Sequence, residues 1–190
     1  MSTEINLSYL LDKTGIRVPL IGFYDAPDPA PFSPLISPSD AGHQCMFCFY
    51  KRWLVGDTVL LTRERYGCAG ASHHLFDQPQ RSRDDFIRFL TDNEGLKCSK
   101  ERMGRWLNTV KSYRPEYPNL LYGPLKSDQY RYLKTVTFFV NPDQLSMLMI
   151  AAQYFADLDD PEPVIAPFGS GCMQSVSLFP DLEKPQAMIA

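Results

Sequence analysis

The ten residues LKTVTFFVNP, numbered 133–142, decide the fold class of this chain. Leu133 to Val140 is rich in β-branched and aromatic side chains, which predicts a strand. Asn141 is a preferred residue at the N-terminal cap of a helix, and Pro142 suits the first helical position. A strand therefore passes directly into a helix here, and we expect that helix to run to about Phe155.

Further strands and helices are expected on both sides of this stretch. The patterns of apolar residues predict strands at Val18–Tyr24, Thr58–Thr62 and Pro163–Phe168. They predict helices at Ile5–Leu11, Gln44–Val55, Ala71–Phe76, Asp84–Thr91, Lys100–Tyr113 and Cys172–Leu178. The chain shows no internal repeat and no domain linker. We therefore expect one α+β domain over residues 1–190, a mixed β-sheet with helices packed on it.

Two segments rich in proline are predicted to be loops. Asp25 to Asp40 contains five prolines, and Arg114 to Asp128 contains Pro115, Pro118 and Pro124. Proline lacks a backbone N–H, so it interrupts helices and central strands. We expect the first segment to be an ordered surface loop or a lid over a pocket.

Composition and charge exclude several classes of partner. The net charge is −3, from 19 basic and 22 acidic residues that are interspersed without a basic run. Such a chain lacks the positive surface that tracks a nucleic-acid backbone. Met1 to Leu11 has no basic region ahead of its apolar residues, and no stretch approaches the roughly 20 apolar residues that span a bilayer. We expect a cytoplasmic protein with neither nucleic acid nor membrane as a partner.

Four of the five cysteines form the most informative pattern. Cys45 and Cys48 make a Cys-x-x-Cys pair near the start of a predicted helix, whereas Cys68 and Cys172 follow glycines in predicted tight turns. Glycine lets the backbone approach a cofactor closely and donate hydrogen bonds to its sulfurs. Four thiolates are the usual ligands of an iron–sulfur cluster or of a structural zinc ion. The wide separation of Cys68 from Cys172 is unlike a compact zinc ribbon, so we expect a cluster, with zinc as the alternative.

Other interpretations of these residues stay open. Cysteine is often buried, so the four could simply fill a core. His73, His74 and His43 could act as ligands or bases beside the cysteines, although histidine has several structural uses. We expect Cys98 to be incidental and the segment from Arg63 to Arg65 to be a solvated charge cluster.

Three functions follow from these residues, and whether the protein is an enzyme stays open. The first is a cytoplasmic cofactor protein that holds an iron–sulfur cluster for electron transfer or small-molecule redox chemistry. The second is a small-molecule binding module in which the Asp25 to Asp40 loop and the tyrosines from Tyr113 to Tyr132 form a pocket. The third is a thiol-dependent enzyme that uses Cys68 or Cys172 with His74. A redox partner, a small molecule and a homo-oligomer are all compatible with the sequence.

Short motifs along the chain resemble the uncharacterised ArCR family, a domain of unknown function (number 169). They are Val18-Pro19-Leu20, Gln44-Cys45, the stretch from Thr62 to Cys68-Ala69-Gly70, Asn141-Pro142 and Gly171-Cys172. The resemblance implies an ArCR-like domain over most of the chain and groups Cys45, Cys68 and Cys172, which leaves the fourth ligand open. It brings no settled activity. Family members continue past the position of Ala190 with further sheet, so we expect a shortened member or a final strand completed by a partner.

Overall fold

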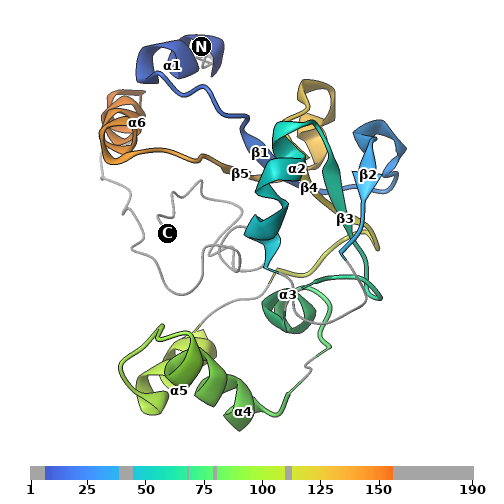
Figure 1. Ribbon diagram of the computed structural model, residues 1–190, viewed down its shortest axis with the longest axis vertical. Helices are drawn as coiled ribbons and strands as arrows, with labels where there is room; N and C mark the ends of the chain where they lie inside the picture. Colours follow the sequence, from blue (N-terminus) through green and yellow to red (C-terminus); the bar gives the residue numbers. More distant parts are fainter. Residues whose placement is uncertain (1–6, 39–44, 68, 79–80, 110–112, 156–190) are drawn as a thin grey trace.

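A computed structural model of the chain describes residues 7–38, 45–67, 69–78, 81–109 and 113–155. Within them the centre of the fold is a five-stranded sheet with strand order β2-β3-β4-β1-β5 (Figure 1). The strands are β1 (Ile21–Asp25), β2 (Leu35–Ile36), β3 (Thr58–Leu61), β4 (Leu120–Pro124) and β5 (Leu133–Thr137).

The sheet is mixed, as the sequence predicts. β1 lies between β4 and β5 and pairs antiparallel with both, and β3 pairs antiparallel with β4. The two-residue β2 pairs parallel with β3. A mixed sheet with helices packed against it confirms the expected α+β class.

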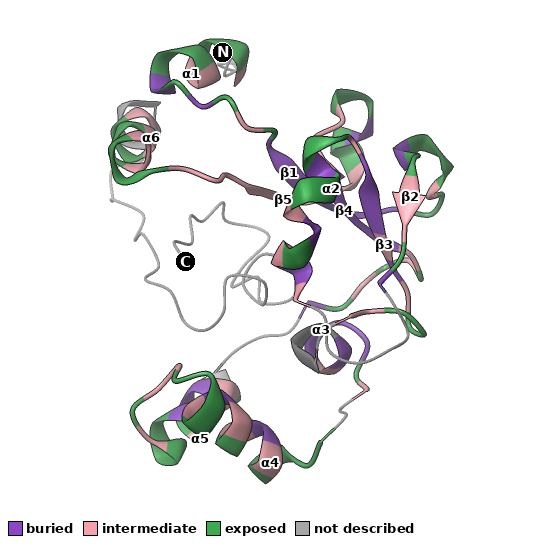
Figure 2. Ribbon diagram, viewed as in Figure 1, coloured by how far each residue is buried: buried purple, intermediate pink, exposed green. Residues whose placement is uncertain are grey.

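Helices and helical turns surround the sheet, and several of them contribute to its larger core. They are α1 (Leu7–Thr14), α2 (Tyr50–Leu54), α3 (Ala69–His74), α4 (Arg83–Arg88), α5 (Lys100–Thr109) and α6 (Pro142–Phe155), with 3₁₀ turns η1 (Ala30–Phe32), η2 (Met46–Phe49) and η4 (Ser127–Tyr132) and a π-helical turn η3 (Phe89–Asn93). Side chains of α2, α4 and α5, and of the two residues after α3, share one apolar cluster with Phe23, Leu61 and Tyr122 of the sheet. The three inner strands β1, β3 and β4 are accordingly buried in Figure 2, whereas β2 and β5 at the sheet edges are half-buried.

The face of the sheet opposite the larger core has a smaller core built on two glycines. Gly22 and Gly123 are register partners in β1 and β4. The ring of Tyr24 lies over Gly22, and it packs on Phe32 of η1 with ring centroids 4.8 Å apart. The Tyr24 hydroxyl also accepts a hydrogen bond from the Lys126 backbone N–H at 2.8 Å. The proline-rich segment after β1 is therefore held on this face of the sheet.

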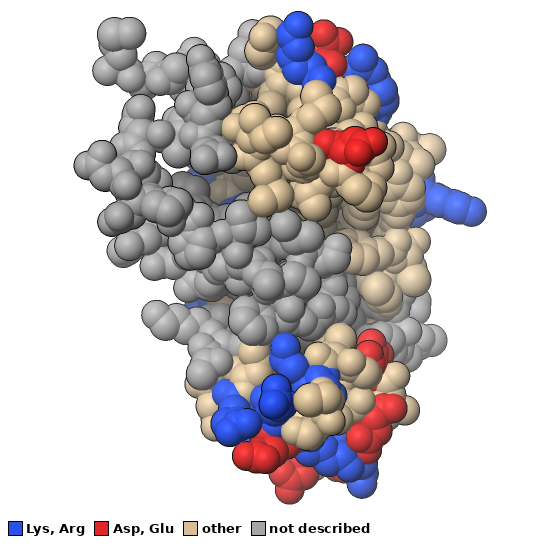
Figure 3. Space-filling view, turned by 90° about the vertical axis from the view of Figure 1, so that its left-hand side faces the viewer, with Lys and Arg blue, Asp and Glu red and all other residues tan. Residues whose placement is uncertain are grey.

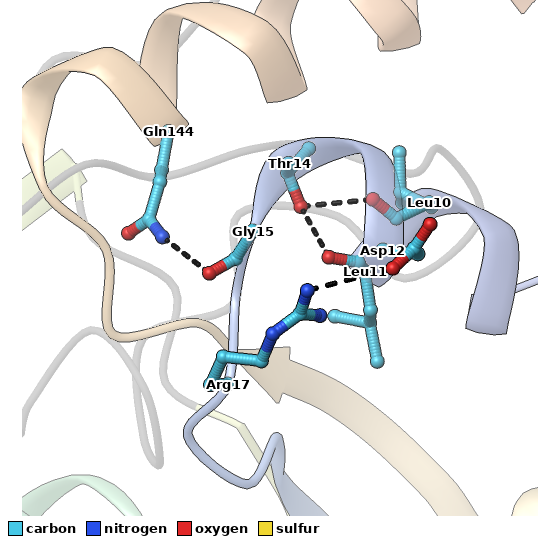
Figure 4. A network of polar contacts seen from close by, with 7 residues as sticks. All are labelled: Leu10, Leu11, Asp12, Thr14, Gly15, Arg17 and Gln144. Atoms are coloured by element: carbon cyan, nitrogen blue, oxygen red, sulfur yellow. Dashed lines mark hydrogen bonds and ion pairs between the residues drawn. The ribbon is translucent and has the colours of Figure 1, made fainter.

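The predicted cap residue Asn141 pairs with Gln144 at the start of α6, and Gln144 joins that helix to α1. Asn141 Oδ1 accepts from the Gln144 N–H at 2.9 Å, while Gln144 Oε1 accepts from the Asn141 N–H at 3.0 Å. This reciprocal pair is a capping box. The remaining nitrogen of Gln144, Nε2, donates to the Gly15 carbonyl just after α1 at 3.0 Å (Figure 4). Gly15 ends α1 in the left-handed conformation, with φ +64°.

The interpretation of residues 114–128 as a loop is wrong in its middle. β4 runs from Leu120 to Pro124 and lies between β3 and β1, so a central strand was missed. Pro118 and Pro124 misled the prediction because proline usually breaks a central strand. Here Pro118 lies before β4, and Pro124 is its last residue.

Most other predicted elements appear with shifted ends. The strand predicted over Leu133–Val140 ends at Thr137, and the helix predicted over Asp84–Thr91 changes to the π-helical turn η3 at Phe89. The predictions for Pro163–Phe168 and Cys172–Leu178 fall outside the described residues.

A buried carboxylate at the end of β1 fixes the segment that leads into β4. Asp25 is fully buried and accepts hydrogen bonds from the Tyr113 hydroxyl, the Glu116 N–H at 2.7 Å and the Tyr117 N–H at 3.0 Å. Burial is the main cause that raises the pKa of Tyr113, and the hydrogen bond to Asp25 is the second. The hydroxyl therefore stays protonated and donates to the carboxylate. An ionised carboxylate is tolerated in a core when several donors satisfy it.

We expect Gly22→Ala to lower the free energy of unfolding by about 1–3 kcal/mol, since it forces an extra methyl into a packed site. An added Cβ would lie 2.6 Å from the ring of Tyr24, which Phe32 and Lys126 hold in place. The matched control is Gly104→Ala in α5, where the added Cβ meets only Ile87 at 3.5 Å. This control should be neutral or stabilising, and urea unfolding measures both.

We expect Asp25→Asn to cost about 2–4 kcal/mol of stability, because the neutral amide weakens charge-assisted hydrogen bonds and leaves a buried group imperfectly paired. Tyr113→Phe removes one of the three donors and should cost about 1–2 kcal/mol. Equal losses in the two variants, measured by urea unfolding, would contradict this account.

Candidate cysteine site

The helix that carries the first two cysteines packs on the sheet through regularly spaced apolar residues. η2 and α2 follow each other without a break from Met46 to Leu54. Met46, Phe49 and Trp53 are buried, at the i, i+3 and i+7 spacing of one helical face. Trp53 Nε1 donates to the Tyr122 carbonyl at 3.1 Å, which fixes the helix against β4.

Cys45 and Cys48 lie one turn apart at the start of this helix, as the sequence predicts. Cys45 is the extended residue that precedes η2, with φ −65° and ψ 137°. The Cys48 N–H donates to the Cys45 carbonyl at 3.0 Å and closes the first turn. Cys45 is half-buried against the large core, whereas Cys48 is exposed. The pair therefore lies at the boundary between core and solvent.

Half-buried aromatic rings flank the same helix. Phe139, just after β5, lies with its ring centroid 5.7 Å from Phe47 and 4.9 Å from Tyr50. It is also 6.2 Å from Trp53. No sequence pattern assigned Phe139 to the neighbourhood of the cysteines, because the contact joins segments far apart in the chain.

The structure does not test whether the other candidate cysteines lie near this pair. Cys68, Cys172 and His43 lie outside the described residues. Cys98 is exposed and lies in the bend just before α5, three residues after the left-handed Gly95. Within the described ranges, no three His, Cys, Asp or Glu side chains are grouped as metal ligands would be.

The adjacent histidines of α3 have different environments. His74 is buried and His73 is half-buried, with ring centroids 4.7 Å apart and both rings near Phe86 of α4. Burial, then the neighbouring His73 and Arg114, lower the pKa of His74 to about 4. Burial also lowers the pKa of His73. His74 is therefore a neutral core residue at physiological pH.

The structure also shows the exposure of the charged segment from Arg63 to Arg65 and of the tyrosines considered for a pocket. Arg63, Glu64 and Arg65 are exposed, and Arg63 also donates to the Phe76 carbonyl at 3.2 Å. Tyr113 and Tyr122 are buried in the core, while Tyr117, Tyr130 and Tyr132 reach the surface. On the face seen in Figure 3, basic and acidic side chains intermingle over the helices α4 and α5 at the bottom of the view.

Comparison with known families identifies the group to which the chain is related. A family model described as "Uncharacterised ArCR" matches residues 19–187, nearly the whole chain. The chain belongs to this family. The resemblance inferred from the short motifs is thus confirmed, and the matched region of this ArCR protein includes Cys45, Cys48, Cys68 and Cys172.

Neither the curated proteins nor the solved structures contain a match to this ArCR chain. Among its described residues, no helix combines the length and the apolar character needed to cross a membrane.

His74 should make the stability of the protein sensitive to acid. Its pKa is about 4 in the folded state and about 6.5 when unfolded, so the unfolded state binds more protons between these values. Stability is then fully retained above pH 6.5 and falls toward pH 4. This difference in pKa corresponds to about 3 kcal/mol.

The measurement is urea unfolding at a series of pH values from 7 to 4 for the wild type and His74→Gln. The variant should lose less stability than the wild type over this range, whatever its stability at neutral pH. His73→Gln, at a half-buried position, should change the slope less. Parallel curves for the wild type and His74→Gln would refute the assignment.

Proposed function

We propose that this ArCR protein binds an iron–sulfur cluster through Cys45, Cys48, Cys68 and Cys172. The observation that carries the proposal is the arrangement of Cys45 and Cys48 in one helical turn, with one thiol exposed and the other at the core boundary. Side chains three residues apart in such a turn lie on the same side of the helix, so two thiols can reach one ligand.

The surroundings of the pair suit a redox centre. Phe47, Tyr50 and Phe139 form a half-buried aromatic group on the same helix and beside it. An apolar shell limits the access of water, and both solvent exposure and hydrogen bonding to the sulfurs set the potential of a cluster. When bound, the cluster would supply one-electron transfer.

Spacing favours a cluster over zinc. A compact structural zinc site normally combines two closely spaced pairs of ligands. Here only Cys45 and Cys48 are closely spaced, and the other two cysteines lie 20 and 124 residues beyond Cys48. Iron–sulfur clusters also bind cysteines that are widely separated in sequence.

The proposed setting is the cytoplasm, with a small molecule or a redox protein as the partner. Reducing conditions there favour the thiol form of exposed cysteines such as Cys48 and Cys98, and any disulfide that they form is transient. The exposed position of Cys48 also favours a centre close enough to the surface to exchange electrons with a partner.

The alternative of a small-molecule binding module is favoured by one observation. The rings of Tyr117 and Tyr132 meet edge to face with centroids 6.3 Å apart, and the Arg131 guanidinium lies 4.6 Å from the Tyr132 ring. Aromatic and arginine side chains at a surface bind planar ligands. The burial of Tyr113 and Tyr122 in the core removes two tyrosines from the pocket first considered.

The thiol-dependent enzyme has less support. His74, the base considered for Cys68 or Cys172, is buried against Phe86 and its pKa lies well below that of a base poised for neutral pH.

The deciding measurement is iron and acid-labile sulfide content, with the visible spectrum, on the full chain purified without oxygen. We expect iron and sulfide in near-equal amounts. Cys48→Ser should lose most of both because it removes a proposed ligand at an exposed position where folding is little affected. Cys68→Ser and Cys172→Ser should behave in the same way.

Cys98→Ser is the matched control, since Cys98 is equally an exposed cysteine but outside the proposed ligand set. It should keep the full iron and sulfide content. If the protein contains zinc and no sulfide, the four cysteines form a zinc site and the cluster is ruled out. If the protein contains no metal under these conditions, the proposal is wrong. Binding of an aromatic metabolite by metal-free protein, lost in Tyr132→Ala, would support the alternative module.

A further inference from the structure

The two thiols at the start of η2 have the geometry of a disulfide-forming pair. The hydrogen bond from the Cys48 N–H to the Cys45 carbonyl, 3.0 Å long, closes a turn between residues i and i+3. Such a turn brings the two Cα atoms within about 7 Å. Disulfides join cysteines whose Cα atoms are about 4.4–6.8 Å apart. The separation of Cys45 and Cys48 is therefore in the range of a disulfide.

Exposure decides which thiol reacts first. Cys48 is exposed, whereas Cys45 is half-buried and packed on the core. An external disulfide reaches Cys48 more easily, because thiol–disulfide exchange requires access to the attacking sulfur. The half-buried Cys45 lies one turn away, in a position to act as the resolving thiol.

We propose that Cys45 and Cys48 form a reversible disulfide when the protein carries no cofactor, with a low-molecular-weight disulfide such as oxidised glutathione as the oxidant. The Cys48 thiolate attacks the oxidant to give a mixed disulfide and release one thiol. The Cys45 thiolate then attacks the Cys48 sulfur, forms the Cys45–Cys48 bond and releases the second thiol. Two electrons pass to the oxidant, which leaves as two thiols that carry the two protons.

This disulfide would regulate the site considered above. A sulfur in a disulfide has no thiolate to offer a metal, so oxidation blocks the first two ligand positions until a dithiol reduces them. That regulatory part rests on the proposed function. The disulfide itself depends only on the positions of Cys45 and Cys48.

The experiment uses the full chain, freed of metal with a chelator and fully reduced, then incubated with oxidised glutathione and digested for mass spectrometry. We expect the peptide that contains Cys45 and Cys48 to lose two hydrogens and to carry no glutathione, and dithiothreitol to reverse this change. Cys98 is the internal control, an exposed thiol without a cysteine one turn away. It should stay a thiol or carry glutathione.

Two variants test the order of the steps. Cys45→Ser should accumulate glutathione on Cys48, because the resolving thiol is gone, and Cys48→Ser should form no internal bridge. Glutathione on Cys48 of the wild type with Cys45 still a thiol would overturn the proposal, as would a bridge from either cysteine to Cys68 or Cys172. Because the protein is free of metal throughout, failure of this inference is separate from failure to find iron and sulfide.

Discussion

The carboxylate of Asp25 is the constraint on which the arrangement of this fold depends. It lies at the end of β1, the strand that pairs with both β4 and β5, and its three donors come from the segment between α5 and β4. A charge buried without partners would cost several kcal/mol, so the donors and the acceptor are stable only together. One side chain thus sets where the chain returns from α4 and α5 to the sheet. β4, placed in this way, supplies the Tyr122 carbonyl that receives Trp53.

The parts of the fold that could be predicted are those determined by neighbouring residues. Asn141, Pro142 and Gln144 specify the start of α6 by themselves, and Gly15 ends α1 where a left-handed residue is needed. β4 could not be predicted in the same way. Leu120 and Leu121 form a strand because β1 and β3 flank them, and nothing local outweighs the prolines at 118 and 124. The parallel pairing of β2 with β3 likewise depends on where the proline-rich segment packs.

The candidate site likewise has features that the local sequence predicts and features that depend on distant residues. The spacing of Cys45 and Cys48 and the helix that begins there follow from a short stretch of sequence. Their unequal exposure does not, because it depends on which face of the helix meets the core of the sheet. His74 illustrates the limit more sharply. Its place six residues after Cys68 suggests a base for that thiol, but its burial against Phe86 is a property of how α3 and α4 pack.

The hydrogen bond between Gln144 and Gly15 joins residues 129 positions apart, and β1 likewise finds its partners about a hundred residues later. During synthesis from the N-terminus, α1 and β1 emerge long before α6, β4 and β5 exist. Contacts between such distant residues form slowly, because a long loop must close before they are made. β1 therefore stays without its strand partners until about a hundred further residues have been made. We therefore expect a nascent chain with this topology to bind a chaperone before its sheet is complete.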